Sequence, residues 1–166
     1  MSKIILNNGK FRKFLKKDYD EVFLFFKKFA INSDLFLLKS NSNHLSIREK
    51  NIKMKETFDE AIRIDVEKYL LIDSDTEKIV AFYSFGIKSK VVEWIFVNPE
   101  YYFTEKIANS ANTFFQMIGK KYNKSKLVIR LFKRSNFTRY VKFVCRHYNA
   151  KVVAEEEDFT IVESNI

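Results

Sequence analysis

Hydrophobic and polar positions between residues 90 and 121 predict a strand, a break and a helix, in that order. Val91–Val97 is rich in β-branched and aromatic residues, which is typical of a buried strand. Pro99 has no N–H to give to a ladder and restricts the residue before it, so the strand should stop there. Thr104 can cap a helix whose apolar residues recur every three or four positions: Ile107, Ala111, Phe114, Phe115 and Ile118. The N–H groups that begin such a helix often face an anionic ligand.

The first third of the chain predicts an extended start and two helices. Residues 4–15 are typical of extended backbone with an edge strand. Asp18 with Glu21 three positions later resembles a capping box, so we expect a helix to about residue 30 with a broad apolar stripe: Val22, Phe23, Phe25, Phe26 and Phe29. Residues 32–46 predict a loop. A second, more charged helix is expected over residues 46–63, and its best core candidates are Ile47, Ile52, Phe58 and Ile62.

The remaining segments predict strands around the long helix. Residues 68–73 and 78–87 should form two antiparallel strands joined by a polar turn. A strand over 126–133 and a last helix over 136–148 follow the long helix, and two closing strands are expected at 151–154 and 159–162. At 166 residues the chain is predicted to be one α/β domain, spanning 1–166.

The strand end Val97-Asn98-Pro99-Glu100-Tyr101 resembles that of the GNAT superfamily of acetyl-CoA-dependent N-acyltransferases. Members of this family carry an apolar strand ending in V-x-P-E-Y, a Gln/Arg-x-x-Gly-x-Gly/Ala loop over the CoA pyrophosphate, and a long helix. The order of predicted elements is similar to the family over roughly residues 10–163. The resemblance implies a mixed, mostly antiparallel central sheet of six or seven strands with helices on both faces.

The resemblance also implies acetyl-CoA as cofactor, held by backbone groups at the strand end and by the start of the helix: Phe96, Val97, Thr104, Glu105, Lys106, Ile107 and Ala108. The segment 102–108 departs from the family pattern because it contains no glycine. Glycines let the backbone approach a pyrophosphate closely, and Glu105 would bring a negative charge towards it. Asn136 matches a position that contacts the pantetheine arm in the family, although an asparagine there is also an ordinary helix cap.

In the family a glutamate on the central strand often takes the proton from the amine acceptor, and Glu93 is the match. Strand alternation should place it on the same face as Val91, Ile95 and Val97. A carboxylate among apolar neighbours holds a proton more readily than one in water and could act as a base near neutral pH. The alternative is that Glu93 faces solvent or pairs with a lysine.

Protonation of the leaving thiolate often falls to a tyrosine on the last helix of the family. An alignment anchored on Asn136 places Phe143 at that position, and one anchored on residues 149–150 places Cys145 there. Neither fills the role as a tyrosine would. Tyr140 and Tyr148 are the nearby hydroxyls, of which we name Tyr140 as the candidate, and a place in the core or at its rim is the alternative for both.

The net charge of +9 is unevenly distributed, since residues 119–151 contain eleven Lys or Arg and no Asp or Glu. Such a segment indicates an anionic partner, which is nucleic acid, the phosphates of CoA or an acidic protein surface, and a solvated face is the alternative. A GNAT-like protein that has lost catalysis and serves as a structural or interaction protein, for example in a virion, is a further hypothesis.

Other classes of site find little support in the sequence. A single cysteine, Cys145, excludes an internal disulfide. Two distant histidines do not make a zinc site, and we expect no metal. No apolar run approaches the length of a membrane span, so we expect no membrane partner and a location in the cytoplasm or inside a virion assembled there.

Overall fold

The computed structural model describes residues 2–32, 45–132, 145–146, 150–156 and 159–166. A 3₁₀ turn at Lys16–Asp18 precedes the first helix, and the named elements are β1 (Gly9–Lys13), α1 (Tyr19–Asn32), α2 (Ile47–Ala61), β2 (Val66–Asp73), β3 (Ile79–Gly86), β4 (Val91–Val97), α3 (Glu105–Tyr122), β5 (Lys126–Phe132), β6 (Lys151–Glu155) and β7 (Phe159–Asn165). The helix predicted over 136–148, with Asn136 and Tyr140, lies outside the described residues except for Cys145 and Arg146, which are helical.

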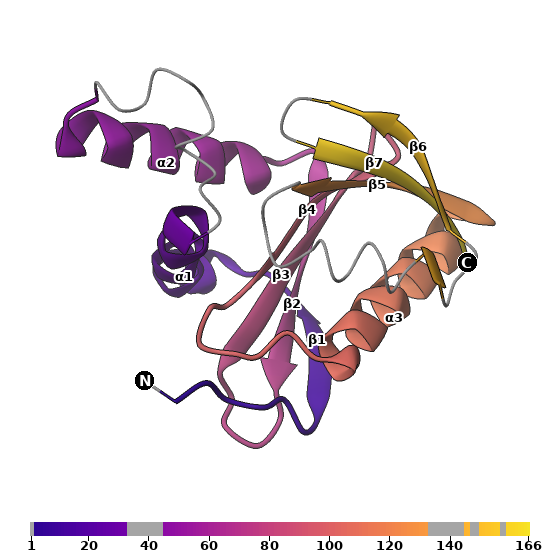
Figure 1. Cartoon of the computed structure of the whole chain (residues 1–166), viewed down its shortest axis with the longest axis horizontal. Coiled ribbons are helices and arrows are strands. Elements are labelled where there is room, and N and C mark those ends of the chain that lie inside the picture. The colour runs from indigo at the N-terminus through magenta and orange to yellow at the C-terminus, as the bar shows by residue number, and fades with distance from the viewer. Residues whose placement is uncertain (1, 33–44, 133–144, 147–149, 157–158) are drawn as a thin grey trace.

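The described strands form one seven-stranded sheet in the order β1-β2-β3-β4-β5-β7-β6 (Figure 1). Neighbouring strands are antiparallel, except that β4 and β5 are parallel. The mixed, mostly antiparallel sheet expected from the sequence is therefore confirmed.

Helices cover both faces of the sheet, as expected. On one face α1 packs on the central strands, with the rings of Phe26 and Phe96 5.1 Å apart. On the other face α3 packs in the same way, with the rings of Phe114 and Tyr83 5.1 Å apart. Figure 1 shows α3 on the opposite side of the strands from α1. Aromatic rings thus fill both layers of the core and fix the positions of the two helices against the sheet.

The predicted β4–α3 unit is confirmed in its boundaries. β4 ends at Val97, directly before Asn98 and Pro99. Thr104 is the N-cap of α3, and its Oγ1 accepts a hydrogen bond from the Ile107 N–H at 3.5 Å. The helix ends at Asn123, whose φ of 51° places it in the left-handed conformation typical of helix ends. The five predicted apolar positions of α3 are all buried.

The predicted core face of α2 is partly wrong. Phe58 is fully buried, but Ile47 is 81% and Ile52 is 47% exposed, and Met54 and Ala61 are buried instead. Met54, Phe58 and Ala61 follow one another at four- and three-residue spacing, whereas Ile52 falls on a different face. α1 contacts α2 at Phe58, in its C-terminal half, so the first turn with Ile47 lies roughly 16 Å from that contact.

The predicted role of Asp18 as a cap for α1 is also wrong, although the helix itself is confirmed. The Asp18 carboxylate turns back to accept from the Leu15 N–H at 2.8 Å and from both terminal nitrogens of Arg12. It closes the 3₁₀ turn before α1 rather than capping α1 with Glu21. None of the described helices combines the length and apolar character that a membrane crossing requires.

Candidate functional site

The carboxyl end of β4 separates from its parallel neighbour. β4 and β5 are each seven residues long, yet their register comprises just two positions, Val91 opposite Val128 and Val92 opposite Ile129. From Glu93 to Val97, β4 has no register with β5. In open α/β sheets, ligands bind outside the carboxyl ends of the strands, so this divergence is the natural place for one.

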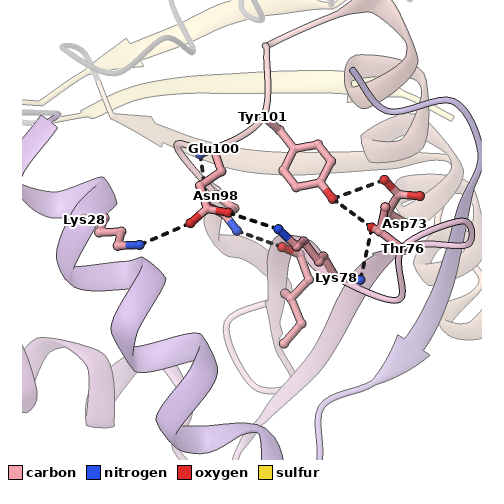
Figure 2. A network of polar contacts seen from close by, with 8 residues as sticks. Lys28, Asp73, Thr76, Lys78, Asn98, Glu100 and Tyr101 are labelled. Atoms are coloured by element: carbon pink, nitrogen blue, oxygen red, sulfur yellow. Dashed lines mark hydrogen bonds and ion pairs between the residues drawn. The ribbon is translucent and has the colours of Figure 1, made fainter. Parts of the chain in front are cut away.

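The segment that links β4 to α3 is held from several sides (Figure 2). Asn98 donates through Nδ2 to the Ile79 carbonyl at 3.0 Å, and its Oδ1 accepts from the Glu100 N–H at 3.1 Å. Glu100 forms ion pairs with Lys28 of α1 at 3.2 Å and with Lys78 at 3.8 Å. Backbone hydrogen bonds join Ile4 to the residues on both sides of Tyr101. The Ile4 N–H donates to the Glu100 carbonyl, and the Ile4 carbonyl accepts from the Tyr102 N–H.

A buried pair completes this anchoring. The Tyr101 hydroxyl donates to Asp73 Oδ2 at 3.1 Å, and both side chains are almost fully buried. Because its single proton is used in this way, the hydroxyl accepts from Thr76 Oγ1 at 3.4 Å. Burial alone would raise the pKa of Asp73, but hydrogen bonds from the Asp75 N–H and from Tyr101 outweigh it and lower that pKa below its ordinary value. The start of α3 is thereby fixed relative to the end of β4.

The first turn of α3 offers two backbone donors. The Ile107 N–H donates to Thr104 Oγ1, and the Ala108 N–H donates to the Thr104 carbonyl. The N–H groups of Glu105 and Lys106 have no acceptor within the described parts of the chain. Both side chains are exposed, and Lys106 Nζ donates to the Asn7 carbonyl at 3.2 Å. The helix N-terminus and the lysine favour an anion here, and the Glu105 carboxylate opposes it.

Glu93 does not follow the alternation expected for β4. Ser84 of β3 lies opposite Trp94 and Phe85 lies opposite Val92, so Glu93 is the extra residue of a β-bulge. Ile95 lies opposite Tyr83, on the α3 face. The Glu93 carboxylate instead lies beside Gly86, towards the end of α2. The expectation that Glu93 shares a face with Ile95 is therefore wrong, because one extra residue shifts the alternation.

Arg63, just after α2, makes the main contact of this carboxylate. Its Nη2 lies 2.9 Å from Glu93 Oε1 and 2.8 Å from Oε2, and Ser89 Oγ donates to Oε1 at 2.9 Å. The hydrogen bond to Glu93 raises the pKa of Arg63. Other donors of Arg63 reach Asp65 at 2.7 Å and the Glu60 carbonyl at 3.3 Å. The guanidinium thus ties the end of α2 to the bulge in β4.

No local sequence pattern indicates the partners of Glu93. Arg63 lies thirty positions earlier and belongs to no motif, and it takes the place of the lysine expected in the alternative. Gly86 is required for the arrangement, because a Cβ there would overlap both Ser89 Oγ and Glu93 Oε1. A glycine ending one strand opposite an acidic residue on the next is the signal that could have pointed to it.

The other predicted site residues separate into two groups. Phe96 is buried against Phe26 and Phe82, and Ile107 and Ala108 are buried in the core with their N–H groups bonded to Thr104, so none of these three side chains can reach a ligand. Glu105 and Lys106 are exposed at the surface, and Val97 and Thr104 are partly exposed. Glu93 lies four residues before Val97, roughly 13 Å away along the strand.

Several basic residues of 119–151 are paired within the chain. Lys121 pairs with Glu67, Lys126 and Lys151 lie 3.3 Å and 3.7 Å from Glu163, and Arg130 lies 3.3 Å from Glu156. These acids come from other parts of the chain and reduce the positive field of the segment. Within the described residues, no group of three or more His, Cys, Asp or Glu side chains is placed to hold a metal ion.

Solved structures of acetyltransferases share this arrangement of helices and strands. The PaiA N-acetyltransferase from Thermoplasma acidophilum, in complex with coenzyme A, superposes with a TM-score of 0.64 over 96% of this chain and 100% of its own, at 16% identity. A spermidine N-acetyltransferase from Vibrio cholerae, in complex with CoA and spermine, gives 0.60 over 95% and 94% of the two chains at 10% identity. An acetyltransferase of the GNAT family from Staphylococcus aureus gives 0.61 over 95% and 99% at 13% identity. The chain has the GNAT fold.

The same fold relates the chain to PseH from Campylobacter jejuni in complex with acetyl coenzyme A, at a TM-score of 0.56 and 13% identity over 95% and 99% of the two chains. No family model and no curated protein sequence matches the chain. The likeness therefore lies in the arrangement of the GNAT fold and not in its amino-acid sequence, which explains why V-x-P-E-Y and the element order were the signals that the sequence retained.

Proposed function

We propose that this chain is an N-acyltransferase that binds acetyl-CoA and transfers the acetyl group to an amine. The observation that carries the proposal is the separation of β4 from β5 directly before the N-terminus of α3, within a GNAT fold. Solved neighbours of this fold hold CoA or acetyl-CoA. The backbone groups of Ile95 and Val97, beyond the register with β5, suit an amide-containing arm, and the Glu105 and Lys106 N–H groups suit a phosphate.

Bound acetyl-CoA supplies an acyl group activated as a thioester. Glu93 would take the proton that the amine loses as its nitrogen bonds to the acyl carbon and the bond from that carbon to sulfur breaks. A carboxylate has about four acceptor positions, and Arg63 and Ser89 occupy two on Oε1 and one on Oε2. The remaining position on Oε2 can accept a proton directly or through one water. Tyr140 stays the proposed proton donor to the thiolate.

The first test is calorimetric titration with acetyl-CoA at two salt concentrations. A basic protein binds any polyanion weakly and loses that binding in salt, so saturable one-to-one binding at the higher salt supports a specific site. Lys106→Glu places a second acid at the start of α3 and should weaken binding about three- to tenfold. Lys120→Glu makes the same charge change at the other end of α3 and should leave binding unchanged.

A second candidate is a GNAT-fold protein without catalysis, which serves as a structural or interaction protein. The observation that favours it is the glycine-free segment 102–108, in which Tyr102 is 50% exposed and Glu105 projects from the first turn of α3. Absence of acetyl-CoA binding would favour this candidate over the enzyme. A parallel titration with double- and single-stranded DNA would then decide whether the basic segment binds nucleic acid.

A further inference from the structure

Lys68 of β2 bonds to the end of α2 through its ammonium group. Its Nζ donates to the Ile62 carbonyl at 2.9 Å and to the Arg63 carbonyl at 2.8 Å. The last carbonyls of a helix have no partner inside the helix, and a lysine side chain can supply one. Lys68 is partly buried, and this burial lowers its pKa. Two hydrogen bonds from one ammonium group therefore fix the backbone of Arg63 relative to β2.

Lys68 and Glu93 lie on the same face of the sheet. Lys68 is opposite Ser84 in the register of β2 with β3, so the two side chains share a face. Gly86 follows Ser84 by two residues on the same strand and therefore shares that face, and the Glu93 carboxylate lies beside it. The contacts thus run across one face, from Lys68 on β2 through Arg63 at the end of α2 to the bulge in β4.

We propose that Arg63 is a positioning residue of the acyl transfer and that Lys68 acts through it. Lys68 fixes the Arg63 backbone, and Arg63 turns Glu93 Oε2 towards the acceptor amine. The proposal rests on the proposed role of Glu93 as the base. Arg63 Nη2 and Ser89 Oγ both donate to Oε1, whereas Oε2 has one close contact, Arg63 Nη2 at 2.8 Å. A base must lie within hydrogen-bond reach of the proton it takes, so a carboxylate that rotates loses rate.

Arg12 and Asp18 form an ion pair of the same kind elsewhere in the fold. Arg12 is 35% exposed and Asp18 is 5% exposed, against 33% for Arg63 and 11% for Glu93. Loss of either arginine leaves a largely buried acid without its cation, so the two losses should destabilise the fold to a similar extent. Arg12 and Asp18 hold the turn before α1 and not the bulge in β4. Substitution of Arg12 therefore controls for the effect of stability alone.

The test is steady-state acetyl transfer to an amine that the wild type acetylates, by Arg63→Gln, Lys68→Met, their double variant and Arg12→Gln. Arg63→Gln should lower kcat about 10- to 100-fold and leave KM for acetyl-CoA within about twofold, because it displaces the base and not the cofactor. Lys68→Met should lower kcat about three- to tenfold. In the double variant Lys68→Met should add no further loss, because Lys68 acts through Arg63. Arg12→Gln should keep kcat within about twofold of the wild type.

Trp94, the single tryptophan of the chain and the neighbour of Glu93, reports the bulge without any acetyl transfer. We expect its fluorescence emission to shift in Arg63→Gln and in Lys68→Met and not in Arg12→Gln, with circular dichroism establishing that each variant is folded.

A kcat of Arg63→Gln no lower than that of Arg12→Gln would overturn the role of Arg63. An equal loss from Lys68→Met with and without Arg63 would overturn the role of Lys68. A wild type that transfers no acetyl group would refute the proposed function, and the Trp94 emission would then decide the positioning of Glu93 by itself. A shift in both variants would support the positioning, and no shift would overturn it.

Discussion

Arg63 Nη2 lies 2.8 Å from Glu93 Oε2 and joins the end of α2 to the bulge in β4. The Arg63 side chain is one-third exposed and Glu93 is 11% exposed, so the carboxylate is the more buried partner. A carboxylate in such a place needs its donors, because a charge without a partner is costly away from water. The pair therefore fixes both the position of the end of α2 and the orientation of Glu93.

Loss of this cation should destabilise the fold. Arg63→Met leaves Ser89 as the remaining donor to the Glu93 carboxylate among the described residues and removes its cation, so we expect the free energy of unfolding to fall by about 1–3 kcal/mol. Urea denaturation measures this. The double variant Arg63→Met with Glu93→Gln should lose less than the sum of the two single variants, since the charge left behind is gone. Strict additivity would show that the two side chains do not interact.

Gly86→Ala should displace the Glu93 carboxylate, because the added Cβ overlaps Oε1 and Ser89 Oγ. We expect acetyl transfer to fall at least about tenfold while the dissociation constant for acetyl-CoA stays within about twofold, because the bulge and not the α3 end is disturbed. Calorimetry and a transfer assay on one preparation separate the two effects. Gly9→Ala is the matched control, since its Cβ meets the end of the Leu71 side chain. Equal losses in both variants would mean that the effect is not specific to Glu93.

Acid should weaken the anchoring of the β4–α3 segment. The pKa of Asp73 is lower in the folded chain than its ordinary value of 3.8, so its contribution to stability is complete above about pH 4 and is lost as the pH falls through the folded value. Tyr101→Phe removes one donor and should cost about 1 kcal/mol at pH 7. The difference in free energy of unfolding between Tyr101→Phe and the wild type should become smaller below pH 4. Tyr102→Phe, at the exposed neighbouring hydroxyl, should follow the wild type at every pH.

The packing face of α2 can be checked with two substitutions. Phe58 is fully buried against Tyr19, Phe23 and Phe26, and Phe58→Ala should lower the free energy of unfolding by about 3–5 kcal/mol. Ile52 is half exposed, and Ile52→Ala should change it by less than about 1 kcal/mol. Urea denaturation curves of the two variants measure both losses. A larger loss for Ile52→Ala than for Phe58→Ala would mean that α2 is rotated about its axis.

The elements with strong local signals could be predicted from the sequence. Apolar periodicity with a threonine cap located α3, and a β-branched run stopped by Pro99 located β4. In α2 the few apolar residues are scattered among charges, so the sequence did not distinguish Met54 from Ile52 as a core residue. Asp18 was assigned to a cap because spacing does not show that Arg12 lies within reach of it.

The site depended on contacts between distant residues, which local patterns do not encode. The V-x-P-E-Y segment indicated the loop but not Asp73, the buried partner of Tyr101. Glu93 was found from its position on the strand, yet the bulge that turns it towards α2 follows from the pairing of β3 with β4. A bulge adds one residue to a strand without a distinct sequence signal, and it changes the face of every assignment on one side of it.

Acetyl transfer itself tests the central claim most directly. Purified chain would be incubated with acetyl-CoA and a panel of primary amines, with free CoA and acetylated amine both quantified by mass spectrometry. We predict equal amounts of the two products for at least one amine. For Glu93→Gln we predict a transfer rate at least about 100-fold lower than that of the wild type, with unchanged acetyl-CoA binding. Saturable acetyl-CoA binding without any acetylated amine, or an unchanged rate in Glu93→Gln, would contradict the account.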